Sequence, residues 1–200
     1  MQKKHHRAFT LIELLIVLII VTTLLGLTFP VLQLTLQSSR KTEAVALMTA
    51  LRSALLQYRT EYGDWPAAVT NFTDSNGDIS IGANQWGELY RSLSGYTNSA
   101  DGYLAANGST NNTRHLIFME FPTKTLSSST TEPYSADESA PADVQNILDP
   151  WLRPYRLLLD ANGDNQLEVP LDSQMIQASI AIWSLGVDTN FATSAITSWK

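Results

Sequence analysis

Two short segments of this 200-residue chain repeat one pattern of oxygen-bearing side chains. Residues 74–78 read Asp-Ser-Asn-Gly-Asp, and Asp160, Asn162 and Asp164 occupy the same places in residues 160–164. Oxygen atoms at alternate positions of a turn can point to a common centre, which suits calcium with its about six to eight oxygen ligands. Glu168 would add a carboxylate to the second segment. Neither segment completes the glycine and final glutamate of an EF-hand loop, so a polar turn without a metal is the alternative for both.

Few residues of the chain could support other metal sites or catalysis. The chain has no Cys, which excludes a disulfide framework, a thiolate zinc site and a cysteine nucleophile. His5 and His6 lie in the extreme leader and leave His115 alone, so a His-based triad is excluded as well. Phosphate-loop, nucleophile-elbow and zinc-protease motifs are absent, and the carboxylates within residues 137–143 resemble solvated loop charges. We expect no enzyme; a membrane-anchored hydrolase is the least favoured alternative.

Charge is unevenly distributed along the chain. The formal net charge of -6 argues against a nucleic-acid partner and against strong attraction to anionic lipid. Charged residues make up 16% of the chain, against about 25% in ordinary soluble domains. The deficit lies near the amino terminus, because no Asp, Glu, Lys or Arg occurs between Glu13 and Arg40.

The amino-terminal region predicts a membrane helix. A basic leader, residues 1–8, precedes an apolar run over residues 9–36 in which Glu13 is the only formal charge. About 20 apolar residues span a bilayer as a helix, and the basic leader predicts a cytoplasmic amino terminus. A secretory signal peptide has a shorter apolar run, about 7–15 residues, and a small-x-small cleavage site. The sequence up to Arg40 fits neither property.

Glu13 is unusual in this run, because a carboxylate inside a membrane helix costs on the order of 3 kcal/mol on insertion scales. One interpretation is a capping box, in which Thr10 and Glu13 satisfy unpaired amides at the start of a helix. The other places the partner of the carboxylate on another chain. Both interpretations stay open on the sequence alone.

The segment from Phe9, Phe-Thr-Leu-Ile-Glu-Leu-Leu-Ile-Val, resembles the class III signal of type IV pilins and type II secretion pseudopilins. The resemblance implies cleavage between Ala8 and Phe9 by a prepilin peptidase, N-methylation of Phe9, and retention of the helix as anchor and assembly surface. It also implies that Glu13 of an incoming subunit neutralises the new amine of its neighbour. Ala8 departs from the usual Gly. Pro30 stands where many pilins have a helix-bending proline.

The helical pattern continues through residues 37–64. An apolar stripe at spacings of three and four indicates one face packed on a core, and it consists of Val45, Met48, Leu51, Leu55, Tyr58 and Tyr62. Gly63 and Pro66 supply the stop.

Residues 65–200 predict one α+β domain with variable loops. A short helix is expected over residues 85–93 and a strand over 115–121, followed by an exposed loop over 123–142. Further strands are expected over residues 154–160, 166–170 and 177–184. The dipeptide Asn162-Gly163 predicts a hairpin between the first two of these strands.

Two further stretches resemble G-type major pseudopilins. They are residues 58–66, at the end of the long helix, and residues 149–155, where Leu152 replaces a Gly. The resemblance implies a pilin-like fold: a long amino-terminal helix whose first half spans the membrane and whose second half packs on a small antiparallel sheet. It also implies a calcium site after residues 184–188, where Asp188 is present but the acidic pair expected further on is absent.

These observations predict a structural subunit rather than a catalyst. We expect a self-polymerising pseudopilin of a type II secretion system, with prepilin peptidase, minor pseudopilins and an inner-membrane assembly platform as partners. A type IV pilin for adhesion, motility or DNA uptake is the alternative, and only the last would contact nucleic acid. The expected location is the bacterial inner membrane, with one pass, a cytoplasmic amino terminus and a periplasmic domain. Calcium is the one candidate cofactor.

Overall fold

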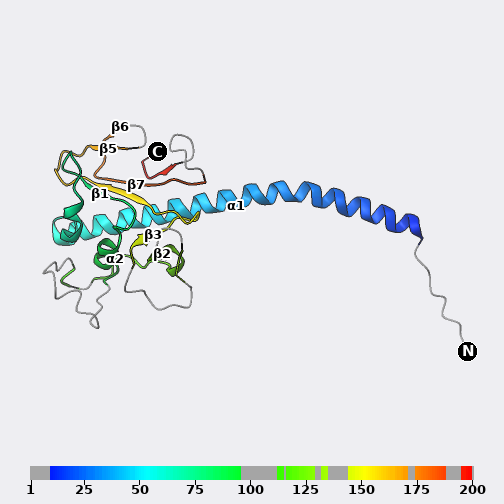
Figure 1. Ribbon diagram of the computed structural model, residues 1–200, viewed down its shortest axis with the longest axis horizontal. Coiled ribbons are helices and arrows are strands. Elements are labelled where there is room, and N and C mark those ends of the chain that lie inside the picture. Colours follow the sequence, from blue (N-terminus) through cyan, green and yellow to red (C-terminus); the bar gives the residue numbers. More distant parts are fainter. Residues whose placement is uncertain are drawn as a thin grey trace, which may run out of the picture. The chain divides into compact units, whose positions relative to one another are not determined.

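The computed structural model describes residues 10–95, 112–114, 116–128, 132–134, 144–170, 174–187 and 195–199, without the side chains of 27–31 and 68. The chain divides into two compact units, unit 1 (Met1–Arg40) and unit 2 (Lys41–Lys200). Their elements follow in chain order (Figure 1): helices α1 (Leu11–Tyr62) and α2 (Gly87–Ser94), 3-10 helices η1 (Ala67–Phe72) and η2 (Thr123–Thr125), and strands β1 (Ile79–Ile81), β2 (Leu126–Ser127), β3 (Asn146–Ile147), β4 (Arg156–Leu159), β5 (Leu167–Val169), β6 (Gln174–Ile176), β7 (Ile180–Ser184) and β8 (Ile196–Thr197).

The fold of unit 2 is α+β, as expected: a helix packs on a small antiparallel sheet. The sheet has the strand order β1-β4-β7-β8, and every pairing in it is antiparallel. Two smaller ladders join β2 to β3 and β5 to β6. Strand β4 lies inside the sheet with a partner on each side, so neither of its edges is left for a further strand.

Alternate residues of the sheet enter two separate cores, because successive strand side chains point to opposite faces. One face adds to the core around α1 with Ile79, Ile81, Leu157, Leu159, Ile180 and Ile182. The other face adds Leu158, Ala181 and Trp183, which pack with Leu167 of β5. The sheet is therefore covered on both faces, and this explains why the five residues of β7 are all buried.

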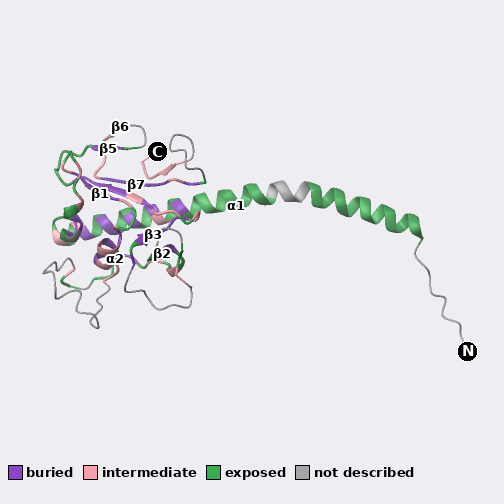
Figure 2. Ribbon diagram, viewed as in Figure 1, coloured by how far each residue is buried: buried purple, intermediate pink, exposed green. Residues whose placement is uncertain are grey.

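The predicted apolar stripe of α1 forms the helix side of the larger core, with one shift. Met48, Leu51, Leu55 and Tyr58 are buried as expected. Val45, however, is 46% exposed and Ala44 is buried in its place. The hydroxyl of Tyr155 donates a long hydrogen bond of 3.5 Å to the Ala44 carbonyl, so the helix approaches the sheet through a small residue at this position (Figure 2 colours burial).

The hairpin predicted at Asn162-Gly163 is wrong. Strand β4 pairs with β1 and β7, while β5 pairs with β6. The side chain of Asp160 is the cause: Oδ1 accepts the Gly163 amide at 2.7 Å and Oδ2 accepts the Asn165 amide at 3.1 Å. These bonds close the segment into a turn of its own, with Asn165 rather than Asn162 at positive φ, and the chain moves to the second ladder.

The strand predicted over residues 115–121 is also wrong, since residues 116–121 form no strand and residue 115 lies outside the described residues. Irregular backbone hydrogen bonds and ring contacts hold this stretch instead. The amides of Phe118 and Met119 both donate to the Leu93 carbonyl, at 2.8 and 3.1 Å. Phe118 packs its ring against Tyr58 and Tyr62, with centroids 5.3 and 6.1 Å away.

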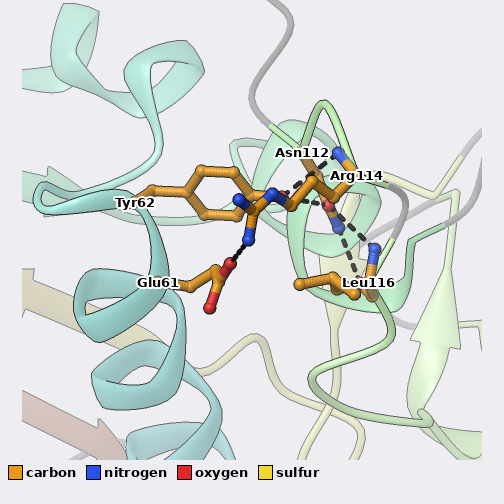
Figure 3. A network of polar contacts seen from close by, with 5 residues as sticks. All are labelled: Glu61, Tyr62, Asn112, Arg114 and Leu116. Atoms are coloured by element: carbon orange, nitrogen blue, oxygen red, sulfur yellow. Dashed lines mark hydrogen bonds and ion pairs between the residues drawn. The ribbon is translucent and has the colours of Figure 1, made fainter.

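Asn112 anchors the same stretch (Figure 3). Its Oδ1 accepts the Tyr62 hydroxyl at 2.7 Å and the Leu116 amide at 3.0 Å. Its Nδ2 donates to the carbonyls of Ser92 and Leu116, at 2.9 and 2.6 Å. One amide side chain thus joins the end of α1, the end of α2 and residue 116. Arg114 adds an exposed ion pair to Glu61.

The helix predicted over residues 85–93 is confirmed as α2. The indole Nε1 of the preceding Trp86 donates to the Tyr155 carbonyl at 2.9 Å. Gly95 ends the helix in the left-handed conformation, with φ +65°, which glycine adopts without steric cost.

Leu152 takes the same left-handed conformation without that advantage. Its φ is +62°, and its side chain is exposed, so no core packing rewards the strain. Asp149 imposes the turn: its Oδ1 accepts the amides of Trp151 and Arg153, at 2.8 and 2.9 Å. Burial raises the pKa of Asp149, and Ser184 donates its hydroxyl to the other carboxylate oxygen. The position at which the resemblance has Gly thus keeps the backbone conformation of Gly.

We predict that Leu152→Gly stabilises unit 2. Left-handed backbone costs a non-glycine residue about 1–2 kcal/mol, and the added flexibility of the unfolded chain returns part of this, which leaves a gain of about 0.5–1 kcal/mol. Urea unfolding followed by tryptophan fluorescence measures the change. Asn165→Gly, at φ +57°, is the matched control and should gain nothing, because Asn tolerates this region. Equal effects of the two substitutions would contradict the explanation.

We predict that Asn112→Ala destabilises unit 2 by about 1–3 kcal/mol, because it leaves partly buried backbone and hydroxyl groups without partners. Glu61→Gln, which breaks only the exposed ion pair to Arg114, should change stability by less than about 1 kcal/mol. Thermal unfolding of the two variants compares them directly. A larger loss in Glu61→Gln would show that the ion pair, not the amide, holds this stretch.

Candidate functional site

The start of α1 is a complete capping box. The Thr10 amide donates to Oε2 of Glu13 at 3.1 Å, and the Thr10 hydroxyl donates to the same oxygen at 2.9 Å. In return, the Glu13 amide donates to the Thr10 hydroxyl oxygen at 3.3 Å. Two amides that a helix start leaves unpaired are thereby satisfied. The local interpretation of Glu13 is observed.

The capping box does not use the whole carboxylate. Both contacts fall on Oε2, and among the described residues Oε1 has no hydrogen-bond donor. Glu13 is solvent-exposed in the single chain. A carboxylate oxygen can accept further hydrogen bonds, so the cap and a cationic partner on another chain are compatible. The structure holds one chain and does not test that partner.

The helix that follows the cap is apolar on every side. Leu14 to Val21 are consecutive large apolar residues, and each is between 44% and 57% exposed (Figure 2). A period of 3.6 residues distributes eight consecutive residues around the whole circumference. Thr22 and Thr23 do not interrupt this surface with free hydroxyls, because they donate to the carbonyls of Leu18 and Ile20, at 2.9 and 2.8 Å. No described residue of unit 1 covers this surface.

The structure constrains the other predicted residues of this region less. Ala8 and Phe9 lie outside the described residues, so their roles stay predictions. Pro30 lies within α1, which is continuous across it. The residues that the structure describes include no helix of the length and hydropathy required to cross a membrane.

The comparison with protein families bears on this same region. Residues 3–29 match the prokaryotic N-terminal methylation motif. The methylation motif supports a type IV pilin-like protein, either a pilin or a pseudopilin, and it is a signal of structural subunits. It implies processing by a prepilin peptidase and membrane-associated filament assembly in general. No curated protein and no solved structure matches the chain.

The two candidate calcium segments, predicted as separate, lie together in unit 2. The Asn162 side chain donates to the Asn76 carbonyl at 3.1 Å. The Asn76 side chain donates in turn to Glu168 Oε2 on β5, at 2.9 Å. Asn162 Oδ1 accepts the Asp164 amide, and Asp164 Oδ1 accepts the Gln166 amide, both at 2.8 Å. Asp188 lies outside the described residues.

Asp78, the last residue of the first candidate segment, lies close to the second segment, which sequence reasoning did not predict. Strands β1 and β4 pair Ile79 with Leu159, so continuing the antiparallel register places Asp78 opposite Asp160. Both are buried. Burial raises the pKa of Asp78 to about 6, against the lowering effect of the Ala161 amide, and the charges of Asp74, Asp160 and Asp164 raise it further. The sequence did contain a signal for this pair, because Asp78 and Asp160 each adjoin a run of β-forming residues.

The described residues contain no set of three or more His, Asp or Glu side chains arranged to hold a metal ion. Calcium in unit 2 therefore stays a prediction.

We predict that Glu13→Gln and Glu13→Ala differ in their effect on the first turn of α1. Gln is the other residue that completes a capping box, so Glu13→Gln should keep the turn. Loss of a cap costs about 0.5–2 kcal/mol, so Glu13→Ala should fray it. Amide exchange at residues 11–14, measured by NMR on the full chain in detergent micelles, should accelerate in Glu13→Ala alone. Exchange that accelerates equally in both variants would mean that the carboxylate charge, and not the cap geometry, holds the turn.

Proposed function

We propose that the chain is a structural subunit of the periplasmic pseudopilus of a type II secretion system. A prepilin peptidase cleaves it between Ala8 and Phe9, and Phe9 becomes the N-methylated first residue. The apolar segment, residues 9–36, holds the subunit in the inner membrane until it polymerises, with the amino terminus cytoplasmic and unit 2 in the periplasm. Growth of the filament drives protein export.

One observation carries this proposal: the apolar surface from Leu14 to Val21 that surrounds α1 within the residues that match the methylation motif. A helix that is apolar on every side needs apolar surroundings on every side. A dimer or a coiled coil would cover one stripe only. Lipid before assembly and several neighbouring helices after assembly both meet the requirement, and residues 14–39 contain no charged residue to oppose either.

Glu13 gives the assembly its direction in this proposal. After cleavage, Phe9 carries an ammonium group four residues before Glu13, and a like pair of groups exists on every subunit. Charges of opposite sign in apolar surroundings are far more stable together than alone. Because Oε2 serves the cap, Oε1 is the oxygen offered to the amine of the neighbouring subunit.

The partners that follow are the prepilin peptidase, further copies of the chain, minor pseudopilins and an inner-membrane assembly platform. A type IV pilin for adhesion, motility or DNA uptake is the second candidate, and the methylation motif supports it equally. Neighbouring genes separate the two: a secretin with a secretion ATPase favours export, and a retraction ATPase favours a pilus. Loss of export, with no loss of surface fibres, in a strain lacking the chain would decide for the pseudopilus.

Processing is the first test. Co-expression with a prepilin peptidase should remove residues 1–8 and add a methyl group to the new amine, both measurable by mass spectrometry of the intact chain. Ala8→Gly should be processed faster, because the resemblance has Gly before the cut. An unprocessed wild-type chain, in the presence of a peptidase that cleaves a known prepilin, would remove the proposal.

Assembly is the second test. The chain has no Cys of its own, so a thiol cross-link between copies must join the introduced residues. Single cysteines placed in turn at residues 14–21 should form thiol cross-links between copies at positions all around α1. Cross-links along one helical stripe would indicate a dimer instead, and none would indicate a lone membrane anchor. With Glu13→Gln, which keeps the cap, processing should be unchanged while the yield of sheared filaments falls at least tenfold. Normal filament yield would contradict the role of the charge.

A further inference from the structure

Two buried carboxyl groups stand opposite each other where β1 begins and β4 ends. Asp78 is 2% exposed and Asp160 is 3% exposed, and each adjoins the last pair of the ladder, Ile79 with Leu159. They are close enough that the charge of Asp160 raises the pKa of Asp78. Directly opposed residues of an antiparallel pair have Cβ atoms about 4.5–5.5 Å apart, and like charges in that position repel. A fold that buries such a pair needs something to offset the repulsion.

Hydrogen bonds offset this repulsion for Asp160 only. Both carboxylate oxygens of Asp160 accept backbone amides, those of Gly163 and Asn165. The Asp78 carboxyl lies close enough to the Ala161 amide for that amide to lower its pKa, which places the carboxyl beside segment 160–164. Its Oδ1 is fully buried and has no hydrogen-bond partner in the part of the chain that the structure describes. An unpaired buried charge is among the most costly groups in a protein.

No basic side chain of the described residues compensates for this charge. The ion pairs found among the described residues involve Glu43, Glu61 and Glu88, none of them in these segments. The charges that act on Asp78 are those of Asp74, Asp160 and Asp164, all negative. The two segments nevertheless hold together, through the contacts of Asn76 with Asn162 and Glu168.

We propose that Asp78 and Asp160 bind one calcium ion, which joins segment 74–78 to segment 160–164. The unpartnered Oδ1 of Asp78 is the first ligand. Asp160 supplies the second, because an oxygen that accepts one amide keeps another lone pair. The two carboxylates balance a divalent charge. The remaining ligands are neutral amide, backbone and water oxygens, since no third acidic side chain of the described residues completes a metal-binding group with them.

The chemistry of the ligands selects calcium. Zinc prefers nitrogen and sulfur, which these segments do not offer. Magnesium needs a near-ideal octahedron and loses its water reluctantly, whereas two flexible polar turns provide oxygens at irregular positions. With only two carboxylates, we expect a Kd of roughly 10⁻⁴–10⁻³ M, the range of extracellular calcium modules. The site does not depend on whether the chain polymerises.

The test uses the full chain in detergent micelles at neutral pH. Calcium chloride should raise the Tm above its value in chelator, with a saturable dependence on concentration, and titration calorimetry should show one site. Magnesium chloride at the same concentration controls for ionic strength and should produce a smaller shift. No Tm shift and no binding heat with millimolar calcium would overturn the proposal.

Asp78→Asn assigns the site. In chelator this variant should melt at the same or a higher temperature than the wild type, because it removes the uncompensated charge. Its response to calcium should be lost. Asp64→Asn, an exposed carboxylate of the same unit that keeps its bond to the Trp65 amide, is the matched control and should respond like the wild type. A full calcium shift in Asp78→Asn would overturn the assignment.

A second measurement tests the site without Asp78→Asn, in case that variant does not fold. The Trp65 indole donates to the Asp160 carbonyl at 2.6 Å, so terbium bound in place of calcium should luminesce when tryptophan is excited. Calcium should displace this signal from the wild type, and Trp65→Phe should reduce it while the calcium-induced Tm shift remains. Luminescence that Trp65→Phe leaves unchanged would place the ion elsewhere and overturn the proposal.

Discussion

Unit 2 depends on one contact, between the buried face of α1 and one face of the sheet. Strands of two to five residues do not form a stable sheet in water by themselves. Met48, Leu51 and Leu55 supply the apolar cover, and each large side chain that leaves water contributes about 1.5–3 kcal/mol. Leu157 and Leu159 of β4 receive it. Because β4 is internal to the sheet, its position also fixes where the chain emerges at Asp160.

Local signals in the sequence were sufficient for α1 and α2 and for three of the eight described strands. Periodicity marked α1, and β-rich runs marked β4, β5 and β7. Pairing was not predictable in the same way, because the partners of β4 are β1 and β7 and both lie far along the chain. The hairpin predicted from Asn162-Gly163 does not form, because the Asp160 carboxylate accepts the Gly163 amide. The opposition of Asp78 and Asp160 is likewise a product of register, which no local pattern contains.

The first turn of α1 shows why the candidate site was only half visible in the sequence. The spacing of Thr10 and Glu13 identifies a cap, and a single chain suffices to form it. The second role that we propose for Glu13 concerns the amine of a neighbouring subunit, which the structure of a single chain does not include. The same limit applies to Leu14 through Val21: apolar composition predicts that they will be covered, but the structure of a single chain does not show what covers them.

The Asn112 contacts have a consequence for the length of the chain between α2 and residue 112. Nδ2 of Asn112 holds the Ser92 carbonyl, so both ends of that connection are fixed to the same place by side-chain chemistry. Once the ends of a loop are fixed, its closure entropy grows only with the logarithm of its length, by about 0.6 kcal/mol for each doubling. Related chains could therefore differ greatly in this connection, and a foreign peptide inserted there would leave the core of unit 2 in place.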